Sequence, residues 1–88
     1  MAANTVTVRN KLGLHARPAA LFVQLANRFK SDIFINKNGV EVNGKSIMSV
    51  MMLAVESGSE IIIRAVGEDA EDAVNALSAL IESGFDEE

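Results

Sequence analysis

The stretch Gly13-Leu14-His15-Ala16-Arg17-Pro18-Ala19-Ala20 marks the point where a strand-like segment gives way to a helix, and it holds the only histidine and the only proline of the chain. Proline fixes φ near its helical value and has no N–H to donate, so it suits the first turn of a helix and not the middle. Pro18 therefore predicts a helix that begins close to His15, with His15 at or near the N-cap. Gly13 allows the sharp turn before it.

This helix start has a chemical consequence. The first N–H groups of a helix have no intrahelical partner, and the helix dipole adds about half a positive charge there. An anion on the imidazole of His15 would meet the N–H groups of Ala16 and Arg17, and the Arg17 guanidinium is a natural partner for phosphate oxygens. Imidazole is largely uncharged and nucleophilic at neutral pH. The segment thus indicates a histidine that carries a phosphoryl group; a cap or an ordinary surface histidine is the alternative.

Two segments resemble one known family. Gly13 to Ala19 resembles the active-site signature of HPr, the histidine-containing phosphocarrier of the bacterial phosphoenolpyruvate:sugar phosphotransferase system. The second segment, Asn43-Gly44-Lys45-Ser46-Ile47-Met48-Ser49-Val50-Met51-Met52-Leu53, is similar to the regulatory serine segment of that family. The resemblance covers nearly the whole chain, so residues 1–88 are identified as a single HPr-like domain.

The resemblance implies a function in sugar uptake. His15 would accept a phosphoryl group through Nδ1 from phospho-enzyme I and pass it to the IIA domains of sugar permeases, while Arg17 holds the phosphoryl oxygens. Such a protein is a carrier rather than an independent enzyme. The alternatives are a regulatory phosphotransfer branch and a co-regulator that acts by protein binding. Relatives of the last kind typically replace the histidine.

Ser46 is the second candidate site, and its position predicts an N-cap whatever else it does. In many relatives the matching serine is modified by HPr kinase/phosphorylase, and some relatives also bind a transcriptional regulator. A phosphate at a helix N-terminus is stabilised by the dipole, so we expect it to block docking by charge without changing the fold. Two residues depart from the family pattern: Leu12 replaces a small polar residue at the rim of the site, and Ser49 stands where glycine is common.

The composition excludes several classes of protein. A chain of 88 residues is one domain, and a net charge of −4 argues against nucleic-acid binding. The absence of cysteine and the single histidine give no metal set and no cofactor site. There is no signal peptide and no apolar run near the roughly 20 residues of a membrane span. We therefore expect a cytoplasmic protein without membrane insertion, and nothing demands more than a monomer.

Hydrophobic periodicity predicts seven elements in the order βαββαβα, an α+β domain with two layers. Asn38-Gly39 predicts a hairpin turn, and the apolar run Ile61-Ile62-Ile63 predicts an interior strand. The resemblance adds that this is an open-faced sandwich, a four-stranded antiparallel sheet with three helices on one face. The strands are expected at 5–8, 32–37, 40–42 and 60–66, and the helices at about 16–28, from Ser46 to 53, and from Gly67-Glu68-Asp69 to a C-cap at Gly84.

The short helix after Ser46 is apolar nearly all round, which a small core cannot cover. Val50 and Leu53 are predicted to be core residues, whereas other side chains are predicted to form a partly exposed docking surface for partner proteins. The alternative is that the methionines fill gaps in the core. The small Ala16 and Ala20 leave room around His15. The predicted partner-binding residues are Ala20, Ile47, Met48 and Met51.

In the helix at 16–28, Ala19, Phe22, Val23 and Ala26 are predicted to face the core. Leu21 and Leu25 form a second apolar flank, so this helix is expected to be covered on more than one side.

Overall fold

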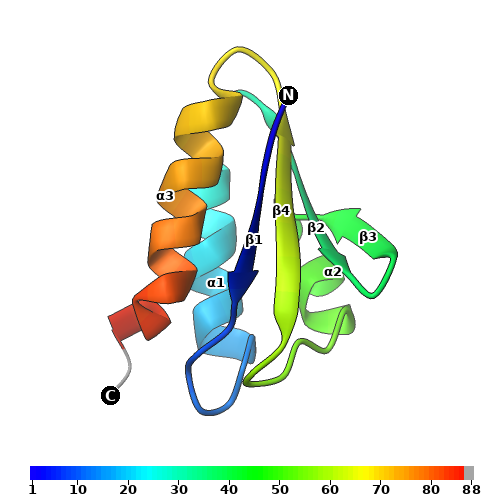
Figure 1. Cartoon of the computed structure of the whole chain (residues 1–88), viewed down its shortest axis with the longest axis vertical. Coiled ribbons are helices and arrows are strands. Elements are labelled where there is room, and N and C mark those ends of the chain that lie inside the picture. Colours follow the sequence, from blue (N-terminus) through cyan, green and yellow to red (C-terminus); the bar gives the residue numbers. More distant parts are fainter. Residues whose placement is uncertain (87–88) are drawn as a thin grey trace.

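The computed structural model describes residues 1–86 and has the predicted order of elements (Figure 1). Helix α1 lies where Pro18 predicts it, and α2 follows Ser46. A short 3₁₀ turn follows the last helix. The elements are β1 (Ala2–Thr7), α1 (Ala16–Ala26), β2 (Asp32–Lys37), β3 (Val40–Asn43), α2 (Ile47–Met52), β4 (Glu60–Val66), α3 (Ala70–Glu82) and the 3₁₀ turn (Gly84–Asp86).

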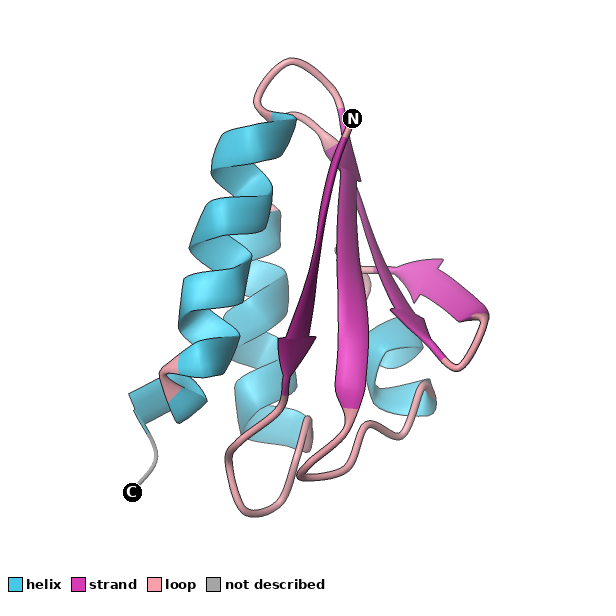
Figure 2. Ribbon diagram, viewed as in Figure 1, coloured by secondary structure: helices cyan, strands magenta, loops and turns pink. Residues whose placement is uncertain are grey.

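The four strands form one antiparallel sheet in the order β1-β4-β2-β3. Strand β4 lies between β1 and β2, as its apolar centre predicts. Its side chains alternate between the two faces, so Ile61, Ile63 and Ala65 are buried while Ile62 is exposed. The sheet is therefore covered on one face and open on the other (Figure 2).

Strand β1 differs from its predicted range of 5–8. It begins at Ala2, which pairs with Ala65, and ends at Thr7, which pairs with Glu60. Residues 2–4 have weak strand propensity, and the ladder with β4 adds them to the strand. Val8 lies beyond the strand, although it extends the pairing: its N–H donates to the Ser59 carbonyl at 2.9 Å.

The core lies between the sheet and the helices and consists of aliphatic side chains around Phe22. The predicted core residues Ala19, Phe22 and Ala26 of α1 are buried, and Val23 is half-buried. Val6 and Val8 are buried, as predicted. The largest fully buried apolar side chains are Phe22, Ile33, Ile35, Ile61, Ile63, Leu77, Ile81, Val8 and Val50.

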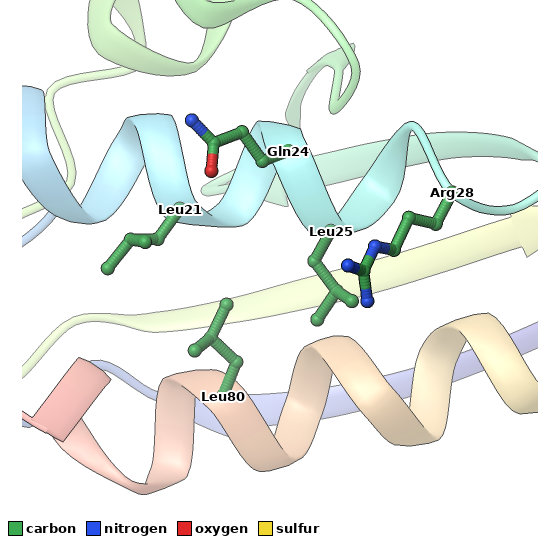
Figure 3. Close-up of a pocket in the computed structure, with 5 residues that line it drawn as sticks. All are labelled: Leu21, Gln24, Leu25, Arg28 and Leu80. Carbon is green, nitrogen blue, oxygen red and sulfur yellow. The ribbon is translucent and has the colours of Figure 1, made fainter.

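The second apolar flank of α1 is covered only in part, because Leu25 packs against the core and Leu21 does not. Leu21 is exposed and Leu25 is half-buried, and both line an open groove of about 250 Å³ between α1 and α3 (Figure 3). Leu80 lines the groove from α3, and Gln24 and Arg28 add polar groups. Leu21 therefore faces solvent at this groove, whereas Leu25 and Leu80 are half-buried and pack against the core.

A carboxylate joins the start of α3 to the turn between α1 and β2. Asp69, the residue before α3, accepts hydrogen bonds from the N–H groups of Lys30 and Ser31, both at 2.9 Å, and from the Ser31 hydroxyl. The Ser31 hydroxyl and then the Lys30 N–H lower the pKa of Asp69 from 3.8 to about 2. Ser31 is buried, so this contact fixes how α3 begins against the rest of the fold.

The open face of the sheet carries an ion pair across three strands. Arg64 donates from Nε and Nη2 to the two carboxylate oxygens of Glu41, at 3.1 and 2.7 Å. The guanidinium also lies over the ring of Phe34, 4.4 Å from its centre. The arrangement holds the edge strand β3 against β4 through side chains, because β2 lies between them.

Candidate functional site

His15 is the N-cap of α1, as Pro18 predicts. Its backbone is extended, with φ −76° and ψ −172°, and its carbonyl accepts the N–H of Ala19 at 2.9 Å. The imidazole makes no capping hydrogen bond to the helix and is half-buried. His15 therefore occupies the N-cap position through its backbone, and its side chain makes no capping bond. The N–H groups of Ala16 and Arg17 precede the first intrahelical bond, and Pro18 has no N–H.

The loop before His15 is docked on the segment that follows α2. Gly13 has φ +68°, and a Cβ at this position would lie 2.3 Å from the carbonyl oxygen of Val55. The next residue, Leu14, donates its N–H to the same oxygen at 3.0 Å. Only glycine fits here, both for its conformation and for the close contact. His15 thus starts from a fixed backbone.

Asn10 supports this loop from inside, a role that no motif of the sequence predicts. Its side chain is 1% exposed, and Nδ2 donates to the Gly13 carbonyl at 2.6 Å. The Gly13 N–H in turn donates to the Asn10 carbonyl at 3.1 Å. An asparagine three residues before a glycine is typical of a turn, which is the only signal the sequence offers for this role.

The electrostatic setting of His15 is basic. Arg17, in the first turn of α1, is exposed, and so are Arg9 and Lys11 in the preceding loop. Glu56, whose backbone packs against Gly13, is an exposed carboxylate on the neighbouring segment. The helix dipole and the Arg17 guanidinium therefore provide the groups that favour an anion at the N-terminus of α1.

Ser46 is the N-cap of α2, as predicted. Its Oγ accepts the N–H of Ser49 at 3.3 Å, and its carbonyl accepts the N–H of Val50 at 3.0 Å. The side chain is half-buried. Two contacts tie this helix start to the end of α1: Lys45 Nζ donates to the Phe29 carbonyl at 2.7 Å, and Asn27 Nδ2 donates to the Lys45 carbonyl at 3.2 Å.

The structure keeps His15 and Ser46 apart. Asn27, the C-cap of α1, contacts the residue before Ser46, whereas His15 is the N-cap. Twelve residues at 1.5 Å each place these two ends of α1 about 18 Å apart. The far end of α2 leads back to the His15 loop through the contact of Val55 with Leu14.

The predicted docking residues lie on the outer side of α2. Ile47, Met48 and Met51 are exposed, as expected, and Ala20 of α1 is half-buried. Val50 and Leu53 are buried, which confirms them as core residues. Met52 is also exposed and enlarges the surface that the sequence predicts.

The described residues offer little for other kinds of site. Within residues 1–86, no set of three or more histidine, aspartate or glutamate side chains is placed to hold a metal ion. No helix in that range has both the length and the apolar character needed to cross a membrane. None of the predicted site residues lines the groove between α1 and α3.

Comparisons with known proteins agree with this geometry. A family model described as "PTS HPr component phosphorylation site" matches residues 2–83. The HPr-like protein Crh of Bacillus subtilis is 54% identical over 82 residues, which cover 93% of this chain and 96% of that protein. Phosphocarrier protein HPr of Xylella fastidiosa is 48% identical over 88 residues, covering 100% and 99%.

Solved structures give the same result. HPr from Thermoanaerobacter tengcongensis superposes with a TM-score of 0.97 at 51% identity, covering 100% of this chain and 99% of the other. A dimer of HPr from the same organism matches with a TM-score of 0.79 at 50% identity, covering 99% and 100%. Because a relative this similar forms a dimer, the prediction of a monomer is not confirmed.

Proposed function

Because the chain belongs to the HPr family of phosphocarrier proteins, we propose that His15 is the residue on which it carries the phosphoryl group. The observation that carries the proposal is the placement of His15 at the N-cap of α1, where its carbonyl accepts the Ala19 N–H and its side chain lies next to the first turn of the helix. An imidazole at this position can serve as a nucleophile next to the positive end of the dipole.

The transfer needs only one bond to form and one to break. An imidazole nitrogen of His15 attacks the phosphorus of a donor phosphohistidine; a new N–P bond forms as the donor's N–P bond breaks and its electron pair returns to the donor ring. The N–H groups of Ala16 and Arg17 and the Arg17 guanidinium stabilise the charge on the phosphoryl oxygens. These groups are exposed at a helix end, so they hold the group without enclosing it, and it can leave again.

The proposed partners are phospho-enzyme I as donor and the IIA domains of sugar permeases as acceptors, which places the carrier in the cytoplasm. The exposed Arg9, Lys11 and Arg17 favour acidic partner surfaces around His15. The apolar part of the contact is the docking surface, which we define as Ala20, Ile47, Met48, Met51 and Met52. This surface extends from α1 onto the exposed side of α2.

Ser46 is proposed as a regulatory site modified by a kinase that recognises α2. A phosphate on Oγ would lie at the N-terminus of α2, where the dipole stabilises it. The modification adds about −1.5 to −2 charge at the edge of the docking surface. Since the two sites lie at opposite ends of α1, Ser46 would act on docking and not on the imidazole.

Labelled phosphoenolpyruvate and enzyme I test the main proposal. The natural chain should gain an acid-labile label, and His15→Ala should gain none while it keeps its fold, since the His15 carbonyl that caps α1 is unchanged. The chain has no second histidine, so no other imidazole can take over. Arg17→Ala should still be labelled, but about tenfold or more slowly, as one charge-assisted contact is lost. Label that persists on His15→Ala would overturn the assignment.

A further inference from the structure

Three of the four methionines of the chain lie on the six-residue helix α2, and the structure exposes all three. Met48 is 70% exposed, Met52 78% and Met51 43%, whereas Val50 is fully buried. At about 100° per residue, Met51 and Met52 lie about 60° and 40° to either side of Met48, and Val50 lies about 160° away. The three thioethers therefore share the outward face of one helix.

We propose that Met48, Met51 and Met52 are an oxidation site that controls docking: their conversion to methionine sulfoxide blocks phosphoryl transfer without unfolding the protein. The proposal rests on the proposed function, because it concerns access of the same partners to His15. The chain contains no cysteine, tryptophan or tyrosine, so the thioethers are its most readily oxidised side chains.

The oxidant is a peroxide. One peroxide oxygen is transferred to the sulfur, the O–O bond breaks and an S–O bond forms. The sulfur loses two electrons, and the peroxide is reduced to water. The product is a polar sulfoxide, which methionine sulfoxide reductases return to the thioether at the expense of two thiols, releasing water and forming a disulfide.

The fold does not depend on these side chains. Helix α2 is anchored by Val50 and Leu53, which are buried, and by the Ser46 cap. Oxidation of buried methionines disrupts a core, but here it changes only the outer surface. The stability of the chain should therefore change little.

The position of the three methionines connects them to the transfer site. Val55 lies three residues after Met52. Its carbonyl accepts the N–H of Leu14, which belongs to the loop before His15. A partner that reaches His15 therefore approaches the segment that follows α2. Docking through this surface after oxidation would bury three polar sulfoxides in place of thioethers, and a buried polar group without a hydrogen-bond partner is costly.

The test uses the full chain, hydrogen peroxide and the enzyme I assay. Mass spectrometry should show three sulfoxides on α2, and kcat/KM for phosphoryl transfer should fall about tenfold or more. The melting temperature should stay within a few degrees, and methionine sulfoxide reductases A and B should restore the rate. Full oxidation of α2 with an unchanged transfer rate would overturn the proposal.

Two variants separate this effect from other damage. Met48→Leu/Met51→Leu/Met52→Leu changes the docking surface itself, so its rate after peroxide is compared with its own untreated rate, and the two rates should be equal although the variant still carries Met1. Met48→Gln/Met51→Gln/Met52→Gln should be slow without peroxide and should fold normally. An equal loss of rate in the leucine variant after peroxide would refute the site. If the untreated natural chain takes no label from enzyme I, the proposed function fails and this proposal fails with it.

Discussion

Gly13 is the residue on which the placement of His15 depends most directly. Gly13→Ala combines a left-handed conformation with a Cβ only 2.3 Å from the Val55 oxygen. We expect a loss of more than about 2 kcal/mol in the free energy of unfolding, with slower phosphoryl transfer because the loop before His15 must move. Urea denaturation and the enzyme I assay measure the two effects.

Gly39 provides the matched control for that prediction. It also has positive φ, +86°, but a Cβ there would meet nothing within 4 Å. Gly39→Ala should therefore cost only the backbone term of about 1 kcal/mol and leave transfer unchanged. If Gly13→Ala and Gly39→Ala lose the same free energy of unfolding, the close approach of Gly13 to Val55 adds nothing to the cost of the substitution.

Ser46 combines a structural role with a proposed regulatory one, and two substitutions separate these roles. Ser46→Asp keeps a good N-cap, so stability should stay within about 0.5 kcal/mol, while its charge should slow transfer from enzyme I several-fold. Ser46→Ala removes the cap and should cost about 0.5–1 kcal/mol with little effect on transfer. A slow alanine variant or a fast aspartate variant in the transfer assay would contradict the proposed regulation.

At the scale of the element, the end of α2 carries a backbone conformation that its sequence does not favour. Ala54, the residue after the C-cap Leu53, has φ +55°. Glycine is the usual residue here, since a left-handed alanine costs about 1–2 kcal/mol, part of which the greater freedom of unfolded glycine offsets. Ala54→Gly should therefore stabilise the chain by about 0.5–1 kcal/mol in urea denaturation.

Ala79 is the appropriate comparison because it is exposed and lies within α3, three residues before the last residue of the helix. Ala79→Gly should destabilise the chain by about 1 kcal/mol, the ordinary cost of glycine in a helix. The same substitution is thus expected to raise the free energy of unfolding at Ala54 and to lower it at Ala79. A destabilised Ala54→Gly would show that the left-handed turn after α2 is absent in solution.

At the scale of the whole molecule, Asp69 holds the start of α3 against the turn between α1 and β2. Its pKa is lower in the folded chain, about 2, than its usual value of 3.8. The stabilisation is therefore complete above pH 4 and is lost as the pH falls from about 4 to about 2. Asp69→Asn should be less stable at pH 7, and its stability should fall less steeply over this acid range.

Unfolding free energies at several pH values between 2 and 7 measure this difference. Asp32→Asn serves as the control, because Asp32 is an exposed carboxylate at the start of β2. The control should keep the pH dependence of the natural chain. If Asp69→Asn also keeps it, the contact with Ser31 does not set the acid stability.

The sequence by itself determined where the two helices that carry the candidate sites begin. Pro18 can occupy only the first turn of a helix, which made His15 the N-cap, and Ser46 before an apolar run made the second cap. The run Ile61–Ile63 likewise predicted the interior position of β4. These signals are local, since each depends on the conformational limits of one residue and its chain neighbours.

Only the tertiary structure decided which contacts hold the N-termini of these helices in place. The contact of Gly13 with Val55, the bond of Asp69 to Ser31 and the early start of β1 opposite Ala65 join residues that are distant in the chain. The groove at Leu21 likewise depends on how α1 and α3, which are distant in the chain, pack together. Periodicity shows which side of an element is apolar, but the neighbour that covers it is set by packing of the whole chain.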